Sequence, residues 1–220
     1  MATRQVLNEL AKAYEQRTGQ PVAIESVGGV DAARRVAARE PFDMVFLAKD
    51  AIDKLVADGS VVAGSRVDLV DSGVSIAVKA GAPRPDISSE EALKRAVLAA
   101  PTVGYSTGPS GVALVKLFER WGIAQELQGR LVQAPPGIPV GALVARGEVA
   151  LGFQQLSELI HLEGIDLLGP MPAAVQITTT FSGALCAASS QGEAVRQVLA
   201  FMASPDAEAA KRRNGMEPSA

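Results

Sequence analysis

The spacing of apolar residues along the first part of the chain switches between a helical period and an extended one. Leu7, Leu10 and Tyr14 recur at spacings of three and four, which predicts a helix that ends at Gly19. The following runs alternate in the same way. The predicted order is this helix, a strand over 21–27, a helix from Gly28-Gly29, a strand over 42–48 and a helix ending at Gly59. Such alternation is typical of a parallel sheet with helices on both faces.

Two β-rich stretches, over 67–83 and 175–189, are longer than a typical strand. Between them the pattern predicts a second α/β unit. Its expected elements are helices over 88–99, 110–123, 138–148 and 155–164, and strands over 101–106, 130–135 and 149–154. After the second long stretch, two helices are expected over 191–202 and 205–213.

The two long stretches are expected to join two lobes. We predict an α/β protein with a discontinuous lobe I over 1–75 plus 182–220, and lobe II over 76–181. Two crossing strands between lobes predict a hinge, with a ligand cleft between the lobes. In α/β sheets, ligands bind at the carboxyl ends of the strands.

Composition narrows the classes of function. The 220 residues are 48% apolar and 20% charged, as in ordinary globular proteins, and the net charge is −3. There is no basic excess for nucleic acid, and no apolar run approaches the ~20 residues of a membrane helix. Cys186 and His161 are the only cysteine and histidine, which argues against a disulfide framework, a zinc site or a histidine-based triad. We therefore expect no metal and no cofactor.

The first residues show no basic segment followed by an apolar one, as a signal peptide would require. As written, the chain is expected in the cytoplasm, or in the periplasm if it is the mature part of a longer precursor. An α/β unit of this type usually starts on a strand rather than a helix. The alternatives are a first strand left out of the sequence as given, a later strand that fills its place, or a strand supplied by a partner chain, as in a homo-oligomer.

Several predicted strand-to-helix turns carry residues suited to anions. Unpaired N–H groups at a helix start, glycines and hydroxyls all favour anion binding. The run "GYSTGPSG" (104–111) is the richest of them, although a simple turn remains the alternative. The turns are Met1-Ala2-Thr3, Gly28-Gly29-Val30, Ser106-Thr107-Gly108 with Ser110-Gly111, and Phe153-Gln154-Gln155. The glycine spacings fit neither a phosphate-binding P-loop nor a dinucleotide fingerprint, so nucleotide binding is not expected.

The segments "VGGVDAARRVAAREPFDMVFLAKDAIDKLVADGSV", "STGPSGVALVKLFERWGI" and "GEVALGFQQLSEL", with the chain's ending, resemble type II periplasmic solute-binding proteins of the molybdate-binding-like branch. The resemblance covers nearly the whole chain. It implies ligand contacts by Met1 to Thr3, Gly28 to Val30, Ala48, Ser106 to Gly111, Gln154 and Gln155. The stretch "GPMPAAVQITTTF" also resembles the aconitate isomerases, enzymes on the same fold that move a proton across an allylic tricarboxylate.

The first two turns depart from the molybdate-binding pattern, which usually places serines there. Met-Ala-Thr and Gly-Gly-Val favour instead a carboxylate with some apolar body. Three hypotheses follow: a solute-binding protein for a small oxyanion or organic carboxylate, which we favour; a cytoplasmic isomerase of an unsaturated polycarboxylic acid; or a ligand-sensing module without a transporter. An exported binding protein would have an ABC-transporter permease as its partner.

The isomerase hypothesis requires an acid and a base beside the substrate carbon. The sequence offers only weak candidates, which are Tyr105, Ser106, Thr107 and Thr179.

Overall fold

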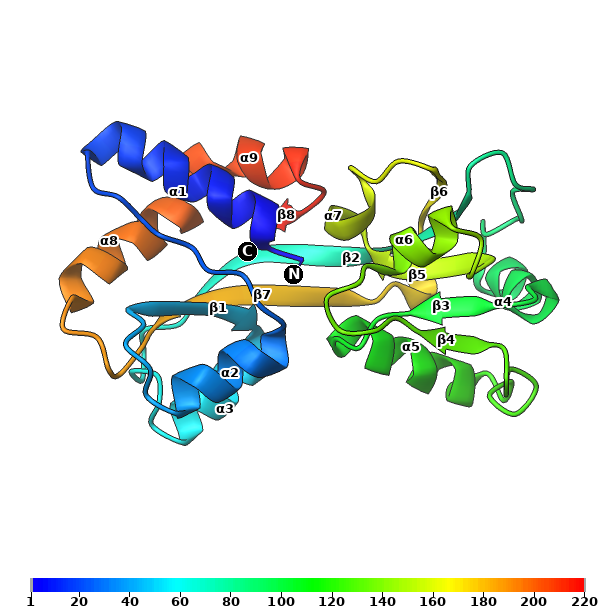
Figure 1. Cartoon of the computed structure of the whole chain (residues 1–220), viewed down its shortest axis with the longest axis horizontal. Coiled ribbons are helices and arrows are strands. Elements are labelled where there is room, and N and C mark those ends of the chain that lie inside the picture. Colours follow the sequence, from blue (N-terminus) through cyan, green and yellow to red (C-terminus); the bar gives the residue numbers. More distant parts are fainter. Residues whose placement is uncertain (1, 220) are drawn as a thin grey trace. The chain divides into compact units, whose positions relative to one another are not determined.

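The computed structural model describes residues 2–219, and Figure 1 shows the order of its elements. It divides into two compact units, one with the residues up to Ser72 and from Thr179 onward, the other with Gly73–Thr178. The chain passes between the units at 72–73 and 178–179, within strands β2 and β7. The sequence had placed these boundaries at 75–76 and 181–182.

Unit 1 holds the first and the last elements of the chain (Figure 1). They are α1 (Arg4–Thr18), α2 (Gly29–Ala37), β1 (Met44–Ala48), α3 (Lys49–Ala57), the first part of β2 (Val67–Lys79), most of β7 (Thr178–Leu185), α8 (Gly192–Ala203), the 3₁₀ turn η2 (Pro205–Ala207), α9 (Glu208–Arg213) and β8 (Glu217–Pro218). Helix α1 ends as predicted at Gly19, whose φ of 75° is left-handed.

The strands of unit 1 run in the order β1–β7–β2, with β8 also paired to β2. The pairs β1–β7 and β2–β8 are antiparallel, so the parallel sheet expected for this part of the chain is wrong. The expected strand over 21–27 is also wrong. Val22 and Ile24 are half-buried against the core of unit 1, so their alternation reflects packing of an extended segment without a strand partner.

Unit 2 contains the second α/β region and the remainder of β2. Its other elements are α4 (Glu90–Ala99), β3 (Val103–Tyr105), α5 (Pro109–Arg120), β4 (Leu131–Gln133), α6 (Val140–Ala145), β5 (Leu151–Gln155), α7 (Leu156–Leu159), β6 (Ile165–Pro170) and the 3₁₀ turn η1 (Ala173–Val175). Strand β6, which pairs antiparallel with β2, was not predicted.

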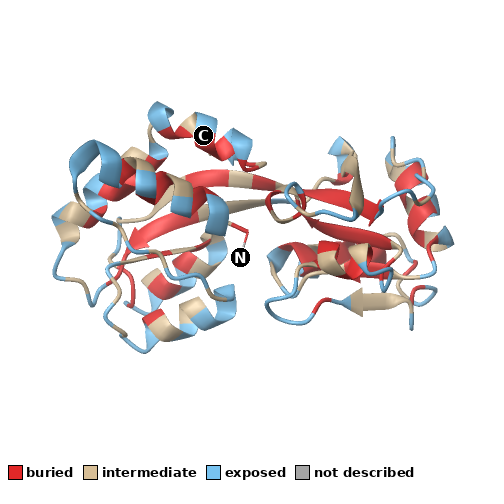
Figure 2. Cartoon of the chain, turned by 45° about the horizontal axis from the view of Figure 1, so that its top comes forward, coloured by how far each residue is buried: buried red, intermediate tan, exposed pale blue. Residues whose placement is uncertain are grey.

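In unit 2, β3 lies between β4 and β5 and is parallel to both, whereas β5 is antiparallel to β2. This parallel part agrees with the expectation for the unit. The apolar faces of α4 and α5 pack on the sheet, and Phe118 at the centre of that core is fully buried. Figure 2 shows the result in both units, with buried strands and helices exposed on their outer faces.

Candidate functional site

The start of α5 gathers the hydroxyl residues that the sequence singled out. Ser106 follows β3 directly, and its hydroxyl oxygen lies 3.2 Å from that of Ser110 in the first helical turn. Gly108, the N-cap residue of α5, supplies no side-chain cap, whereas α4 is capped by Ser89, whose hydroxyl accepts from the Ala92 N–H at 3.1 Å. The hydroxyls at α5 are therefore paired with each other rather than used to cap the helix.

Gly111 explains how this turn becomes so tight. A Cβ atom at Gly111 would lie 1.8 Å from the carbonyl oxygen of Ser106, closer than any real contact. Only glycine allows the helix start and the end of β3 to approach in this way. The spacing Ser106, Ser110, Gly111 thus has a structural reason as well as a chemical one.

A pair of glycines brings a second helix start to the same edge of the sheet. Gly104 on β3 lies opposite Gly152 on β5, and a Cβ at either would come within 2.7 Å of a valine methyl. The valines belong to α6 and the segment after it, so α6 can pack directly on these two strands. As a result, the Gly141 N–H of α6 donates to Gln154 Oε1 at 3.3 Å.

The end of β5 carries buried polar groups. Gln154 and Gln155 are 3% and 5% exposed, and Gln155 Nε2 has no hydrogen-bond partner within the described residues. The Ser157 hydroxyl, in the following α7, is buried and equally unpartnered there. Because β3 and β5 are parallel, their carboxyl ends and the residues after them share one edge of unit 2.

Glu158, in α7 just after the end of β5, is an acidic residue near this edge that the sequence reasoning did not consider. Burial raises the pKa of its carboxyl group.

The predicted site residues of unit 1 lie at three helix starts. Thr3, Gly28 and Ala48 are the N-cap residues of α1, α2 and α3, and none of them supplies a side-chain cap. Ala2 is buried, Gly29 is the first residue of α2, and Val30 is 83% exposed. Met1 lies outside the described residues. Within this unit, only backbone N–H groups and the Thr3 hydroxyl are available at these positions.

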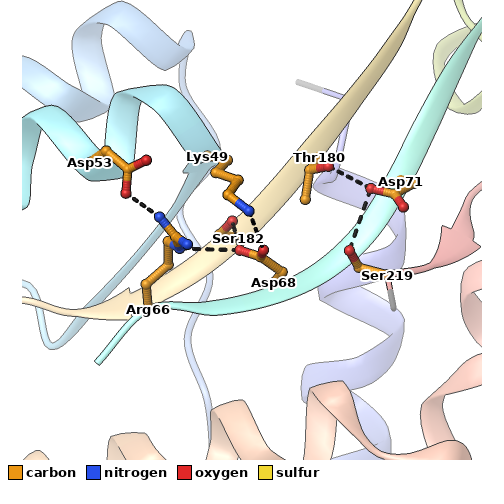
Figure 3. A network of polar contacts seen from close by, with 8 residues as sticks. All are labelled: Lys49, Asp53, Arg66, Asp68, Asp71, Thr180, Ser182 and Ser219. Atoms are coloured by element: carbon orange, nitrogen blue, oxygen red, sulfur yellow. Dashed lines mark hydrogen bonds and ion pairs between the residues drawn. The ribbon is translucent and has the colours of Figure 1, made fainter. Parts of the chain in front are cut away.

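A network of charged residues adjoins the start of α3, as Figure 3 shows. Lys49, which follows Ala48, binds Asp68 of β2 at 2.8 Å, and the Ser182 hydroxyl of β7 donates to the same carboxylate at 2.7 Å. Arg66 pairs with both Asp68 and Asp53. Burial would raise the pKa of Asp68, but the hydrogen bonds from Lys49 and Ser182 and the charge of Arg66 hold it below its ordinary value.

A second cluster lies further along the same two strands. The Thr180 hydroxyl donates to Asp71 at 2.6 Å, and the Ser219 hydroxyl lies 3.4 Å from the same oxygen (Figure 3). These contacts tie β2, β7 and the residues after β8 together inside unit 1. Because the polar groups of these residues bond to one another, we assign the network a structural role.

The side of α1 that faces β1, β2 and β7 borders a small apolar cavity. Its lining residues are Thr3, Val6, Leu7, Leu10, Phe46, Leu69, Val70, Phe181 and Ser182. The start of α1 is therefore in a more apolar setting than the start of α5.

The weak acid–base candidates do not form one cluster in either unit. Tyr105 ends β3 next to Ser106 and Thr107 in unit 2, whereas Thr179 belongs to β7 in unit 1. Among residues 2–219, no group of three or more histidine, cysteine or acidic side chains is arranged to hold a metal ion.

Comparison with known proteins identifies the family to which this chain belongs. The model of the bacterial extracellular solute-binding protein family matches residues 1–217, and the chain belongs to that family. An aconitate isomerase from Pseudomonas sp. is 43% identical over 218 residues, which are 96% of this chain and 83% of that protein. None of the helices in the described part of the chain is long and apolar enough to cross a membrane.

Solved structures show the same fold. The periplasmic molybdate-binding protein of Azotobacter vinelandii has a TM-score of 0.79 at 21% identity, covering 98% of this chain and 95% of that one. The tungstate-binding protein of Desulfovibrio alaskensis G20 has a TM-score of 0.72 at 16% identity, with 97% and 93% covered. The type II periplasmic-binding-protein fold predicted from the sequence is thus confirmed.

Proposed function

We propose that the protein binds a small unsaturated polycarboxylate and isomerises it as an aconitate isomerase does. The observation that carries this proposal is the 43% identity to an enzyme of that name over 96% of the chain. This reverses the order of the two functions favoured by the sequence alone, where binding without chemistry came first.

The polar groups of unit 2 support a carboxylate ligand. The paired Ser106 and Ser110 hydroxyls, the start of α5 and the unpartnered Gln155 amide are neutral hydrogen-bond donors at one edge of the sheet. Such donors bind carboxylate oxygens well, because the ligand supplies the charge and the helix start supplies a favourable dipole. The predicted residues Ser106, Thr107, Gly108, Ser110, Gly111, Gln154 and Gln155 form this part of the proposed site.

The proposed reaction needs only the movement of a proton and a double bond. A base removes a proton from the CH₂ carbon beside the C=C bond, and the C–H electrons form a new double bond with the central carbon. The former vinyl carbon receives a proton in return. In aconitate both outer carbons carry a carboxylate, so the product has the same connectivity, and either geometry about its double bond is accessible.

The experiment is to incubate the protein with cis-aconitate in deuterated water and to follow the sample by proton NMR. We expect the trans isomer to appear together with deuterium at the CH₂ and vinyl carbons. If the substrate keeps both its geometry and its protons at high protein concentration, the isomerase proposal is rejected.

Capture of an anion without chemistry is the second candidate, and membership in a solute-binding family favours it. Melting temperatures measured with molybdate, sulfate, phosphate, citrate and both aconitate isomers distinguish the ligand classes. A ligand at about 100 times its Kd stabilises the folded state by about 2.7 kcal/mol, which is a readily measured shift. Stabilisation by molybdate alone would favour an oxyanion carrier, whose partner would be an ABC-transporter permease if the protein is exported.

Hinge motion belongs to the same proposal. Because the chain joins its two units only through β2 and β7, a ligand that binds both units would bring them together. Small-angle X-ray scattering should then give a smaller radius of gyration with aconitate than without it. An unchanged radius at a saturating ligand concentration would argue against closure.

A further inference from the structure

Strand β2 changes its pairing partners within two residues. It pairs with β8 up to Asp71, and from Val74 onward it pairs with β5. Between these two ladders lie only Ser72 and Gly73, the residues at which the chain passes from unit 1 to unit 2. Because each ladder belongs to a single unit, β2 is held firmly on both sides of this dipeptide. Bending of the strand is therefore least hindered at these two residues.

A side-chain link joins the two crossing strands just before this passage, in unit 1. The Thr180 hydroxyl of β7 donates to Asp71 of β2 at 2.6 Å (Figure 3). The Ser219 hydroxyl lies 3.4 Å from the same carboxylate oxygen, and the Ser219 N–H donates to the Leu69 carbonyl oxygen at 3.2 Å. This part of β2 is thus fixed both to β7 and to the residues after β8, so we expect it to move as one body with unit 1.

A second link lies just beyond the passage, in unit 2. Gln176 Oε1 accepts from the Val74 N–H at 3.1 Å and from the Ile177 N–H at 2.8 Å. The Val74 N–H also donates to the Ile177 carbonyl oxygen at 3.0 Å. The Gln176 amide can lie against β2 because the residue beside it is Gly73, where a Cβ atom would come within 3.3 Å of Gln176 Nε2. Gln176 therefore joins β2 to the segment that leads into β7.

The dipeptide between the two links is not held by its own side chains. Gly73 has none, and glycine is the residue least restricted in its backbone angles. The Ser72 hydroxyl is completely buried, yet it has no hydrogen-bond partner among residues 2–219. A buried hydroxyl without a partner raises the free energy of the arrangement that contains it. Rotation at Ser72 and Gly73 therefore breaks no side-chain hydrogen bond of either residue.

We propose that Ser72-Gly73 is the pivot of the hinge on β2, and that Thr180 and Gln176 are positioning residues whose links confine bending to it. A pivot of two residues gives the units one defined path, so a ligand meets the same arrangement of binding groups each time they close. Without the links, bending would spread along β2 and β7, and the units would sample more arrangements. This inference deepens the hinge motion of the proposed function and rests on it.

The test measures the distribution of distances between the two units in the free protein. Spin labels are attached at Glu15→Cys on α1 and Lys116→Cys on α5, both exposed positions, in a Cys186→Ala background, and pulsed electron paramagnetic resonance gives the distances. Thr180→Val and Gln176→Leu each remove one link. We expect either change to broaden the distribution, because the strands are then free to bend at more than one place.

Thr18→Val and Gln128→Leu are the matched controls. The Thr18 hydroxyl donates to the Tyr14 carbonyl oxygen at the end of α1, and Gln128 is exposed in unit 2, so neither takes part in the links described. Their distance distributions should match that of the labelled parent protein. Melting temperatures are recorded for every variant, because a link with a merely structural role would lower the melting temperature without broadening the distribution.

The outcomes for the pivot and for ligand-driven closure are separate. An unchanged distribution in either link variant, or equal broadening in the controls, would overturn the assignment of the pivot. If Gln176→Leu does not fold, Thr180→Val decides, since valine only replaces the hydroxyl of threonine by a methyl group. Trans-aconitate is then added to the labelled parent protein. A distribution that does not shift to shorter distances would overturn the proposed closure, whereas the comparison of the free proteins judges the pivot alone.

Discussion

The Ser106 and Ser110 hydroxyl oxygens lie 3.2 Å apart at the start of α5 and are paired with each other. The cap of α4 shows what a serine does when its role is only structural, since Ser89 accepts directly from a backbone N–H of the helix. The two arrangements lie in the same unit and differ in how the hydroxyl is used. This difference makes the α5 start the stronger candidate for ligand contact.

Replacing both Ser106 and Ser110 by alanine should weaken anion binding while leaving the protein folded. Hydrogen bonds to a charged ligand contribute about 1.5–3 kcal/mol each, so the double variant should bind aconitate about 100-fold more weakly or worse. Isothermal titration calorimetry measures this loss. Ser89→Ala is the matched control, because it removes a hydroxyl from another helix start and should cost about 1 kcal/mol of stability without changing affinity. Equal affinity in wild type and double variant would mean that the loop is only a turn.

Gly111→Ala should damage both stability and binding. The added Cβ would lie 1.8 Å from the Ser106 carbonyl oxygen, so the turn must open to relieve the clash. We expect a loss of about 1–3 kcal/mol in the free energy of unfolding, as for other overpacked sites, and weaker aconitate binding. Urea unfolding and calorimetry measure the two effects.

Gly192→Ala provides the comparison for that variant. Gly192 is the first residue of α8, and a Cβ there would meet its neighbours at 3.4 Å and beyond, which the flexible Arg196 side chain tolerates. Alanine in a helix is favoured over glycine by about 1 kcal/mol, so this variant should be neutral or more stable. If Gly111→Ala is as stable as Gly192→Ala, the tight turn does not constrain the loop as described.

Much of the fold follows from the sequence because its signals are local. The periodic apolar residues Leu7, Leu10 and Tyr14 are all buried on one face of α1, and Gly19 ends that helix in a left-handed conformation. The pairing of strands is not local in this way. Val22 and Ile24 have the alternation of a strand but no partner strand, whereas β6 pairs with β2, a strand far from it in the sequence.

The candidate site was predictable only where its chemistry coincides with a turn motif. Ser106, Ser110 and Gly111 stand out in the sequence because hydroxyls and glycines cluster there, although their contact with a ligand stays a prediction. Glu158 does not stand out, because a glutamate in an amphipathic segment is usually a solvated charge. The close approach of α6 to β3 and β5, which Gly104 and Gly152 allow, is likewise revealed by no local pattern.

Lys211→Met should stabilise the protein near neutral pH. Lys211 is only 1% exposed, and burial lowers the pKa of its amine, against the opposing charge of Glu208. Because the folded pKa lies below the unfolded one, the unfolded chain binds the proton more readily, and stability rises with pH between those two values. Methionine removes the buried charge, so we expect the free energy of unfolding to increase by about 1–2 kcal/mol at neutral pH. As the pH rises toward about 10, the stability of the variant should increase less than that of the wild type.

The control for this variant is Lys54→Met, which changes the same side chain at an exposed position in the last turn of α3. Its free energy of unfolding should differ from that of the wild type by no more than about 0.5 kcal/mol. Thermal unfolding at both pH values measures all three proteins. A destabilised Lys211→Met protein would show that the amine makes contacts more favourable than its burial is costly.

Asp68→Asn should destabilise the protein at neutral pH, and the difference from the wild type should shrink in acid. The pKa of Asp68 is held below its ordinary value of 3.8, because Lys49 and Ser182 hydrogen-bond to the charged form and Arg66 lies nearby. A carboxyl group with a depressed folded pKa contributes stability that is complete above its unfolded pKa and is lost as the pH falls through the folded pKa.

Asparagine cannot hold the charge, so we expect a loss of about 1–2 kcal/mol at neutral pH, limited by the exposure of Lys49. As the pH falls through the depressed pKa of Asp68 and the carboxyl group of the wild type takes up a proton, the two proteins should converge. Asp50→Asn, an exposed acid in the first turn of α3, should change the stability by only a few tenths of a kcal/mol across the same range. Urea unfolding of the three proteins over this pH series measures the effect, and a gap between wild type and Asp68→Asn that stays constant with pH would show that the network does not depend on the charge of Asp68.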